Sequence, residues 1–500
     1  MGARLEFVGS SAVSGDSVAE WVRPSEWPAL TIPNAAEQKV TGIYAVWPPV
    51  GGTNPTWLAM LFMGGYTVDW GDGSVPENFA SNVKSEHQFN WDNCVSAAID
   101  INSAASGTLY YIETLGNTSQ ADWNTLAGTV GLTYTAGDSF NAAVAGSTLS
   151  NSTGTVSTAP HRFATVVVTP QAGQNLTTVN LSQETTTGDL IDSGQWLDLA
   201  ISAASCTTLV VRTSNVEQRA LERVTIVAHA VTNMSAMFQN CSGLQLVQLS
   251  NTAAVTDMSF MFQSCLGLRS VQLFNTAAVT DMSSMLQNCF SLQSVPLFNT
   301  SAVTNMSFML FGCSSLQSVP LFNTAAVTNM SAMFQNCPSL RSVPLFNMAA
   351  VTNMSAMFQN CSGLQLVPLF NTAAVTNMSN AFLGCSNLQS VPLFNTAAVT
   401  NMNSTFFGCS NLQSVPSFNT AAVTNMNTMF PQGGCLQRSR VLSAAANHSY
   451  LNNNLSAAAL NEIYTNLATI TARTITVTGN PGTAGDNPAI ATAKGWTVTG

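Results

Sequence analysis

A 24-residue repeat runs through the second half of the chain and limits what the chain can fold into. The tetrad Val-Thr-(Asn or Asp)-Met recurs nine times with this step, from Val231–Met234 to Val423–Met426. Cysteines keep the same step at Cys241, Cys265, Cys289, Cys313, Cys337, Cys361, Cys385 and Cys409. Fixed periods of this size are typical of solenoids and propellers, and a propeller blade needs about 40 residues. The repeat therefore predicts a solenoid of 24-residue coils.

Each coil is expected to run from a strand through a loop into a short helical turn. In the coil 279–302, the pattern Leu-x-x-Val-x-Leu at 292–297 is the strand of a leucine-rich repeat, with alternate side chains pointing inward. Met282, Met285 and Leu286 have the i, i+3, i+4 spacing of one helix face. Sixteen of the 20 methionines occupy the first two of these positions across the repeats, which indicates core packing and not a metal or ligand site.

Two rows of asparagines have predicted structural roles. The Asn or Asp of the tetrad, such as Asp281, immediately precedes the helical turn, where its side-chain oxygen can accept a backbone N–H as an N-cap. A second row, from Asn251 to Asn419, follows the strand, where Asn side chains close turns.

Prolines and phenylalanines disturb the predicted strand. Each proline lacks a backbone donor, so hydrogen bonding to the next coil must be interrupted or very short at Pro296, Pro320, Pro344, Pro368, Pro392 and Pro416. Strict alternation would place seven aromatic side chains in solvent, namely Phe274, Phe298, Phe322, Phe346, Phe370, Phe394 and Phe418. Either these rings form a binding stripe or the chain turns and buries them. Burial is favoured, because large apolar stripes seldom face water.

Charged residues are scarce in this chain. They make up 8% of the sequence, against about 25% in an average protein, and the net charge is -10. The segment 229–436 holds only four, which are Asp257, Asp281, Arg269 and Arg341. A surface this neutral cannot neutralise phosphates, so nucleic acid is not expected as a partner. The first residues lack the apolar core of a signal peptide and no stretch reaches the roughly 18 apolar residues of a membrane span, so neither standard secretion nor membrane insertion is expected.

The consensus of the repeats also carries a family resemblance. Its pattern Val-Thr-Asn-Met-Ser-x-Met-Phe-x-x-Cys-Ser-x-Leu, over residues 229–436, resembles the BspA-like leucine-rich repeats of bacterial surface proteins. The segments Leu455–Tyr464, Thr474–Pro481 and Ala493–Trp496 are similar to the ends of such proteins. Their own patterns predict a helix, a strand, then a helix or turn followed by a strand, which suits a polar terminal cap.

A different resemblance lies in the front half. Tyr66–Ser74 alternates as a strand and runs into an Asp-Gly turn, and Ser85–Phe89 follows after a loop. Together these segments resemble the Trp-Gly-Asp-Gly and His-x-Tyr landmarks of a PKD-type β-sandwich, with Phe89 in place of Tyr. Later strands of this sandwich are expected at 166–173 and 176–181.

An insertion in the sandwich adds the third resemblance. The segment from Tyr111 to Val156, rich in Gly, Thr, Ala and Ser, is similar to a small β module of tailed-phage structural proteins, and the opening Arg23–Pro28 resembles phage virion proteins. The fold class is thus mainly β with short helices. The predicted parts are an N-terminal arm at 1–29, a PKD-like β-sandwich at 30–107 and 158–205, an inserted small β module at 108–157, a leucine-rich-repeat solenoid at 206–436 and a small α/β cap at 437–500.

No catalytic, cofactor or metal site is predicted. Asp257 and Asp281, one coil apart, would approach the separation of about 5 to 5.5 Å found in retaining glycosidases. Asn fills the same position in the other seven tetrads, however, which indicates capping. The four histidines are far apart in sequence, and Asp69 with Asp72 are too few ligands for Ca²⁺, so these carboxylates are expected to form a turn.

The cysteine row allows two interpretations. Coils about 5 Å apart would bring stacked cysteines within disulfide range. Free thiols are favoured, because Cys also serves as a small buried hydrophobe and no signal peptide is expected.

These observations predict a non-enzymatic virion protein of a tailed phage, a fibre, spike or capsid decoration, that attaches to the host surface. The front half would bind other virion proteins, and the solenoid would bind a host glycan or protein; fibres of this kind are often trimers. A bacterial cell-surface adhesin is the alternative, followed by a glycan depolymerase. The virion, assembled in the host cytoplasm, or the bacterial surface is the expected location. The predicted ligand contacts are Gln272, Gln293, Gln317, Gln365, Gln389, Gln413, Phe298, Phe322 and Phe346.

Overall fold

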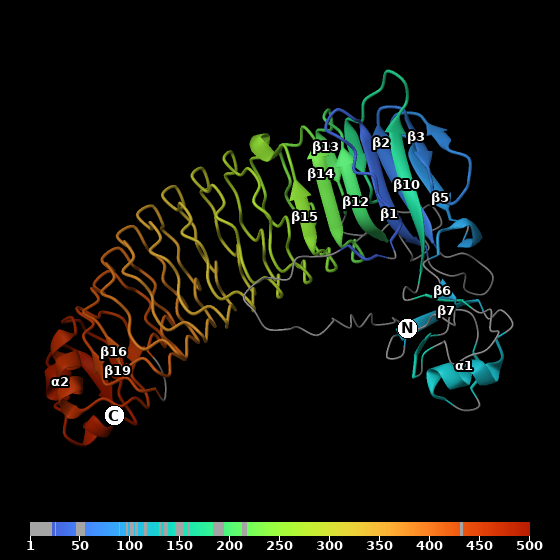
Figure 1. Ribbon diagram of the computed structural model, residues 1–500. Coiled ribbons are helices and arrows are strands. Elements are labelled where there is room, and N and C mark those ends of the chain that lie inside the picture. The colour runs from blue at the N-terminus through green and yellow to red at the C-terminus, as the bar shows by residue number, and fades with distance from the viewer. Residues whose placement is uncertain are drawn as a thin grey trace.

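In the computed structural model, a β-sandwich leads into a curved solenoid that ends in a small cap (Figure 1). The fold is mainly β with short helices, as the sequence patterns predicted. The structure describes residues 23–25, 27–46, 56–89, 91–96, 99–100, 105, 109–114, 118–129, 132–134, 139–143, 145, 155–157, 161–183, 195–212, 218–430 and 434–500. Within these residues, none of the helices has the length and apolar character that a membrane crossing requires.

Two sheets pack face to face in the front half. The larger has the order β15-β14-β12-β1-β10-β3-β4 and the smaller β13-β11-β2-β5. Side chains of both sheets, among them Tyr44, Phe62 and Trp70, share one core. The strands are β1 (Lys39–Val46), β2 (Trp57–Met63), β3 (Tyr66–Asp69), β4 (Glu77–Phe79), β5 (Lys84–Gln88), β10 (Arg162–Pro170), β11 (Thr178–Asn180), β12 (Trp196–Ser202), β13 (Thr208–Val210), β14 (Arg223–Ala228) and β15 (Leu246–Leu249).

The larger sheet continues from the sandwich into the solenoid. β12 pairs antiparallel with β1 on one side and parallel with β14 on the other, and β14 pairs parallel with β15. All seven residues of β12 are buried, as expected for a strand covered on both faces. The predicted division of the chain at 205/206 stays a prediction, but the two parts share one hydrogen-bonded sheet across it.

A small β module is inserted in the sandwich. Its four strands have the order β6-β9-β7-β8, and its separate core contains Tyr110, Trp123 and Phe140. The elements are β6 (Ile99–Asp100), β7 (Leu109–Thr114), α1 (Gln120–Ala127), β8 (Ser139–Asn141) and β9 (Thr155–Ser157), preceded by the 3₁₀ helix η1 (Trp91–Asn93). The helix α1 was not predicted, although Ser119 and Asp122 form a capping box that marks its start.

The helical turn predicted in each coil is absent from the described residues, but the side chains predicted to face the core are buried. Met282, Met285 and Leu286 are fully buried. The backbone from Met282 to Asn288 forms successive turns, with left-handed φ angles of 55° at Ser284 and 59° at Asn288. Alternate N–H groups along these turns donate to carbonyls of the next coil and not along the coil, as an α-helix would require. The turns therefore stack coil on coil.

The strand of each coil is short, as its prolines predicted. Between β15 and β16 (Ser414–Val415), the described residues have only isolated bridges, such as Ser270 with Ser294. The longest row of bridges passes instead through the Asn or Asp of the tetrads, from Asn233 to Asn425.

The side-chain directions at the end of each short strand are the reverse of those that strict alternation gives. The N–H of Phe298 donates to the carbonyl of Pro296 at 2.9 Å, a three-residue turn with Leu297 at its apex. Strict alternation placed Leu297 inside and Phe298 outside, and the structure has the opposite. The same bond closes the turn before Phe322, Phe346, Phe370, Phe394 and Phe418.

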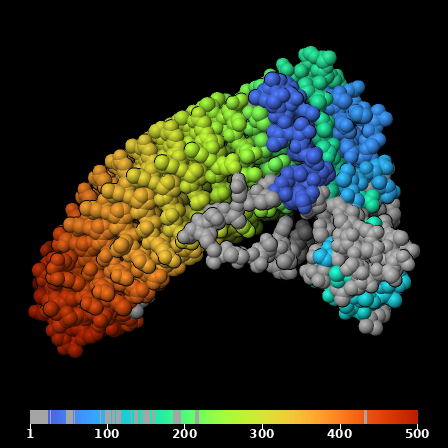
Figure 2. Space-filling model, in the orientation of Figure 1, coloured from blue at the N-terminus to red at the C-terminus, as the bar shows by residue number. Residues whose placement is uncertain are grey.

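The C-terminal cap closes the far end of the arc, where the stacked coils end (Figure 2). Its parallel sheet has the order β18-β19-β20, and α2 covers it, in agreement with the predicted helix and strands. The elements are β17 (Arg438–Ser439), which pairs with β16, then β18 (His448–Ser449), α2 (Ala457–Asn466), β19 (Arg473–Thr476), η5 (Pro481–Ala484), α3 (Ala489–Thr492) and β20 (Trp496–Thr499). One further 3₁₀ helix, η4 (Thr252–Ala254), lies in the first repeats.

Candidate functional site on the solenoid surface

The most regular polar side chains of the solenoid bind their own backbone. In all nine tetrads the Asn or Asp side chain accepts the N–H two residues ahead, at 2.7 to 3.2 Å. Asp257 and Asp281 do so like their seven Asn counterparts, and the other oxygen of each accepts from a neighbouring Asn side chain. The predicted capping role is thus confirmed, although the side chains close a turn and not a helix end. Both carboxylates, of Asp257 and Asp281, are engaged in these bonds.

Two further polar rows stabilise the solenoid, one within each coil and one between coils. In the second asparagine row, seven side chains from Asn275 to Asn419 accept the N–H two residues ahead, which confirms their turn-closing role. The adjacent threonines are buried and donate to a carbonyl of the next coil at 2.7 to 2.9 Å. Met348 replaces threonine in one coil and is fully buried there.

The cysteine row is a packing feature with free thiols. Seven consecutive Sγ atoms, from Cys265 to Cys409, donate to a carbonyl of the preceding coil at 2.9 to 3.2 Å. Burial raises the pKa of Cys289 to about 12, so the thiolate that reacts or binds metal is absent at neutral pH. Among the cysteines, Cys435 alone is exposed.

The predicted phenylalanine contacts lie inside the solenoid. Phe298, Phe322 and Phe346 are 1 to 2% exposed. The rings stack in order through the core, for example Phe346 on Phe370 at 6.4 Å between ring centroids. An exposed stripe at these positions is therefore wrong, and burial, the favoured alternative, is confirmed.

The predicted glutamine contacts are all exposed, but they do not form one row. Gln293, Gln317, Gln365, Gln389 and Gln413 share one coil position, whereas Gln272 occupies the position that later coils give to proline. Their part in ligand binding stays a prediction. An unpredicted apolar row lies nearby in each coil, with exposures of 56 to 65%, at Leu273, Leu297, Leu321, Leu345, Leu369 and Leu393.

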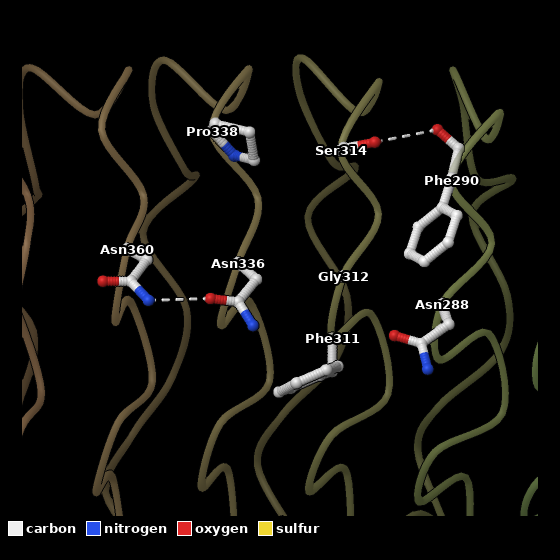
Figure 3. Close-up of a pocket in the computed structure, with 8 residues that line it drawn as sticks. All are labelled: Asn288, Phe290, Phe311, Gly312, Ser314, Asn336, Pro338 and Asn360. Atoms are coloured by element: carbon white, nitrogen blue, oxygen red, sulfur yellow. Dashed lines mark hydrogen bonds between the residues drawn. The ribbon is translucent and has the colours of Figure 1, made fainter.

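A groove opens on the turn side of the solenoid, across four coils (Figure 3). It has a volume of about 610 Å³. The first coil contributes Asn288 and Phe290, the next Phe311, Gly312 and Ser314, and the last two Asn336, Pro338 and Asn360. Phe290 is 48% exposed, and Gly312 is buried at the floor.

The groove opens where one coil departs from the following coil at two adjacent positions. Phe311 and Gly312 stand where the following coil has Gln335 and Asn336. A Cβ atom on Gly312 would lie 2.5 Å from Asn288 Oδ1, so a side chain here would close the floor unless that amide moved. The sequence analysis missed this site, although comparison of aligned coils would have shown two adjacent deviations.

The histidines have structural surroundings. Burial lowers the pKa of His161 and His448 to about 4, so both are neutral core residues at pH 7. His87 stacks on Trp70 at 4.6 Å and contacts Asp72 at 2.9 Å. Within the described parts of the chain, no three His, Cys, Asp or Glu side chains gather closely enough to hold a metal ion.

The predicted turn at Asp69 and Asp72 is confirmed. Asp69 accepts the N–H of Gly71 at 3.0 Å. Asp72 accepts the N–H and hydroxyl of Ser74 at 3.2 and 2.7 Å. Both carboxylates therefore close the loop that follows β3.

Comparison with known proteins supports the repeat interpretation. Segments 214–318, 266–367, 290–388 and 364–439 match the family described as "Mycoplasma protein of unknown function, DUF285". This match and the observed solenoid fit a BspA-like repeat protein. No curated protein matches the chain.

Proposed function

We propose that this chain is a non-enzymatic structural protein of a tailed-phage virion, exposed on the particle as a tail fibre, spike or decoration. Its solenoid attaches to the host surface, through a glycan, and its PKD-like front half docks on other virion proteins. The observation that carries this proposal is that the regular polar rows bind the backbone of their own or the next coil, whereas uncharged amides and leucines face outward. Such a surface suits uncharged sugars, which need flat apolar contacts and amide hydrogen bonds. The small β module inserted in the sandwich supports the virion context by its resemblance to tailed-phage proteins.

Mass spectrometry of purified virions tests the first part of the proposal. The protein is expected in intact particles at a copy number above that of packaged contaminants, and its absence would overturn the virion assignment. Purified chain added to host cells should compete with virions for adsorption. Release of new reducing ends from envelope polysaccharide would contradict the non-enzymatic assignment and favour a depolymerase.

A bacterial cell-surface adhesin is the second candidate, because the matched family is described as a Mycoplasma protein and Mycoplasma are bacteria. Surface biotinylation of a bacterium that encodes the chain distinguishes the two. Labelling of intact, phage-free cells is expected for an adhesin and not for a virion protein.

A further inference from the structure

We propose that the groove around Gly312 is a carbohydrate-binding site for uncharged pyranose units of a polysaccharide. This inference rests on the proposed glycan attachment and adds the place and the contacting residues. Neither the repeat consensus nor the matched family assigns a role to this groove.

Aromatic side chains line two sides of the groove. Phe290 comes from one coil and is 48% exposed, and Phe311 comes from the next, where its ring lies 6.0 Å from that of the exposed Phe308. The ring of Phe311 leans toward the coil that carries Asn336 (Figure 3). The C–H face of a pyranose ring packs on such a flat apolar surface, while its hydroxyl groups remain free to bind polar side chains.

Amide side chains supply the polar partners. The Asn288 amide lies beside Gly312 and has no hydrogen-bond partner among the described residues. Asn360 donates to Asn336 at 2.9 Å, which leaves the Asn336 amide group free to donate. An amide both donates and accepts, and a sugar hydroxyl does the same, so the two groups match.

The lining selects against other ligand classes. None of the eight lining residues carries a charge, so an anionic ligand would find no cation there. The volume of about 610 Å³ is that of a ligand pocket, but the groove is open and spans several coils. An extended chain of sugar units fits this shape better than an enclosed small molecule.

The groove also interrupts a structural ladder. The side chains of Gln239, Gln263 and Gln287 are linked by hydrogen bonds from coil to coil, and Phe311 ends this row. A residue that only holds coils together is expected to be the same in each coil, as the caps and cysteines are. Phe407 and Gly408 repeat this exchange, but there the preceding coil has Ser386 where the groove has Phe290. The groove at Gly312 thus has an aromatic ring from each of two coils, which supports ligand binding at this place.

Two variants and one control test the proposal in the full chain. Phe290→Ala removes one apolar wall. The double variant Phe311→Gln/Gly312→Asn restores the repeat consensus and fills the groove, and it should fold because Asn336 and Asn360 adopt a φ of 60° at the same coil position. Phe407→Ala is the control, since Phe407 is exposed at the position of Phe311 four coils further along.

Calorimetric titration with cellohexaose, maltohexaose and chitohexaose, and retention of host-envelope polysaccharide, are the measurements. We expect binding of at least one hexasaccharide by the wild-type chain, about tenfold weaker binding by Phe290→Ala, and complete loss in the double variant. The control should bind as the wild type does, and all melting temperatures should agree.

Two results would show that the groove is not a carbohydrate-binding site. Only the second would also contradict the proposed glycan attachment. If the wild type retains polysaccharide and both groove variants retain it equally, the groove is not the site, and glycan attachment still stands. If the wild-type chain binds neither the hexasaccharides nor the envelope polysaccharide, both the groove and the glycan attachment fail.

Discussion

At the scale of single residues, the solenoid depends on side chains that each bind a backbone group of their own or an adjacent coil. Asp281 shows that such a position requires a side-chain oxygen at the right place, which either Asp or Asn provides. Its Oδ1 accepts the N–H of Ser283 at 2.7 Å, a bond that an Asn makes equally well in the neighbouring coils. The position therefore tolerates exchange of carboxylate for amide and resists loss of the oxygen.

We expect Asp281→Asn to change the free energy of unfolding by less than about 0.5 kcal/mol, and Asp281→Ala to lower it by about 1 kcal/mol. Urea denaturation followed by circular dichroism measures both. Equal stability of the Ala variant and the wild type would contradict the capping role.

The thiols give a second prediction at this scale. In the native protein at pH 8, only Cys435 should react with a thiol reagent, because burial raises the pKa of the row and blocks access. After denaturation without reductant, all 11 cysteines should react. A denatured count below 11 would show that disulfides exist.

The burial of a side chain could be predicted from sequence wherever the local spacing rule holds. It could not where the strand's alternation of inward and outward side chains breaks down. The burial of Met282 and the cap at Asp281 followed from spacing and propensity alone. Strict alternation gives Leu297 and Phe298 the wrong directions, because the turn between Pro296 and Phe298 adds a residue outside the alternation. Burial of the ring was favoured only because large apolar stripes seldom face water. That turn is a tertiary choice, driven by burial of the larger ring, and no propensity rule contains it.

At the scale of elements, the junction between sandwich and solenoid depends on one buried carboxylate. Asp198 in β12 has no exposed surface and accepts hydrogen bonds from Arg223 in β14 at 2.6 and 2.7 Å and from Arg23 at 3.2 Å. The first repeat strand and the N-terminal segment are thus held by the same group.

Asp198→Asn should lower the free energy of unfolding by about 3 to 5 kcal/mol, because it leaves two guanidinium groups partly buried without their counter-charge. Differential scanning calorimetry gives the change in melting temperature. Asp281→Asn serves as the matched control, being the same exchange on the repeat surface. A similar melting temperature for both variants would show that Asp198 does not hold the junction.

The cap has a predicted acid sensitivity. Burial lowers the pKa of His448 from 6.5 to about 4, so an unfolded chain binds this proton more readily than the folded one. The stabilisation is complete above pH 6.5 and should fall by about 3 kcal/mol as the pH falls to 4. His448→Phe keeps an aromatic ring against Trp496 but has no titrating group. In thermal melts, this variant should lose less stability between pH 7 and pH 4 than the wild type does. If the melting temperatures of variant and wild type fall equally from pH 7 to pH 4, His448 does not cause the acid sensitivity.

The cap elements were predictable, whereas the shared sheet was not. The helix α2 and the strands β19 and β20 have clear local patterns within short segments. The pairing of β12 with both β1 and β14 joins residues from distant parts of the chain, and nothing in the local sequence of β12 states which neighbour lies on which side.

At the scale of the whole molecule, the repeats make the solenoid modular, since each coil contacts mainly its two neighbours. Deletion of the coil 375–398 keeps every row in register. We expect a folded, shorter solenoid whose melting temperature lies within about 5 °C of the wild type. Circular dichroism and gel filtration measure the outcome.

Deletion of residues 375–386 is the control, because half a coil would bring turns against strands and break every row beyond that point. This variant should aggregate or unfold. Equal stability of the two deletions would contradict the modular arrangement. The solenoid itself was predictable because its period is written in the sequence, but the groove was not, because it arises where the period is broken.

The continuous sheet also has a mechanical consequence. A protein held at one end and attached to a surface at the other carries tension along its length. The hydrogen bonds between coils run along the arc, and those of β12 to β1 and β14 extend this direction into the sandwich. Force would pass from the cap to the front half through many hydrogen bonds between each pair of coils. The solenoid would therefore resist extension as one stiff elastic body, and its coils would not separate one by one.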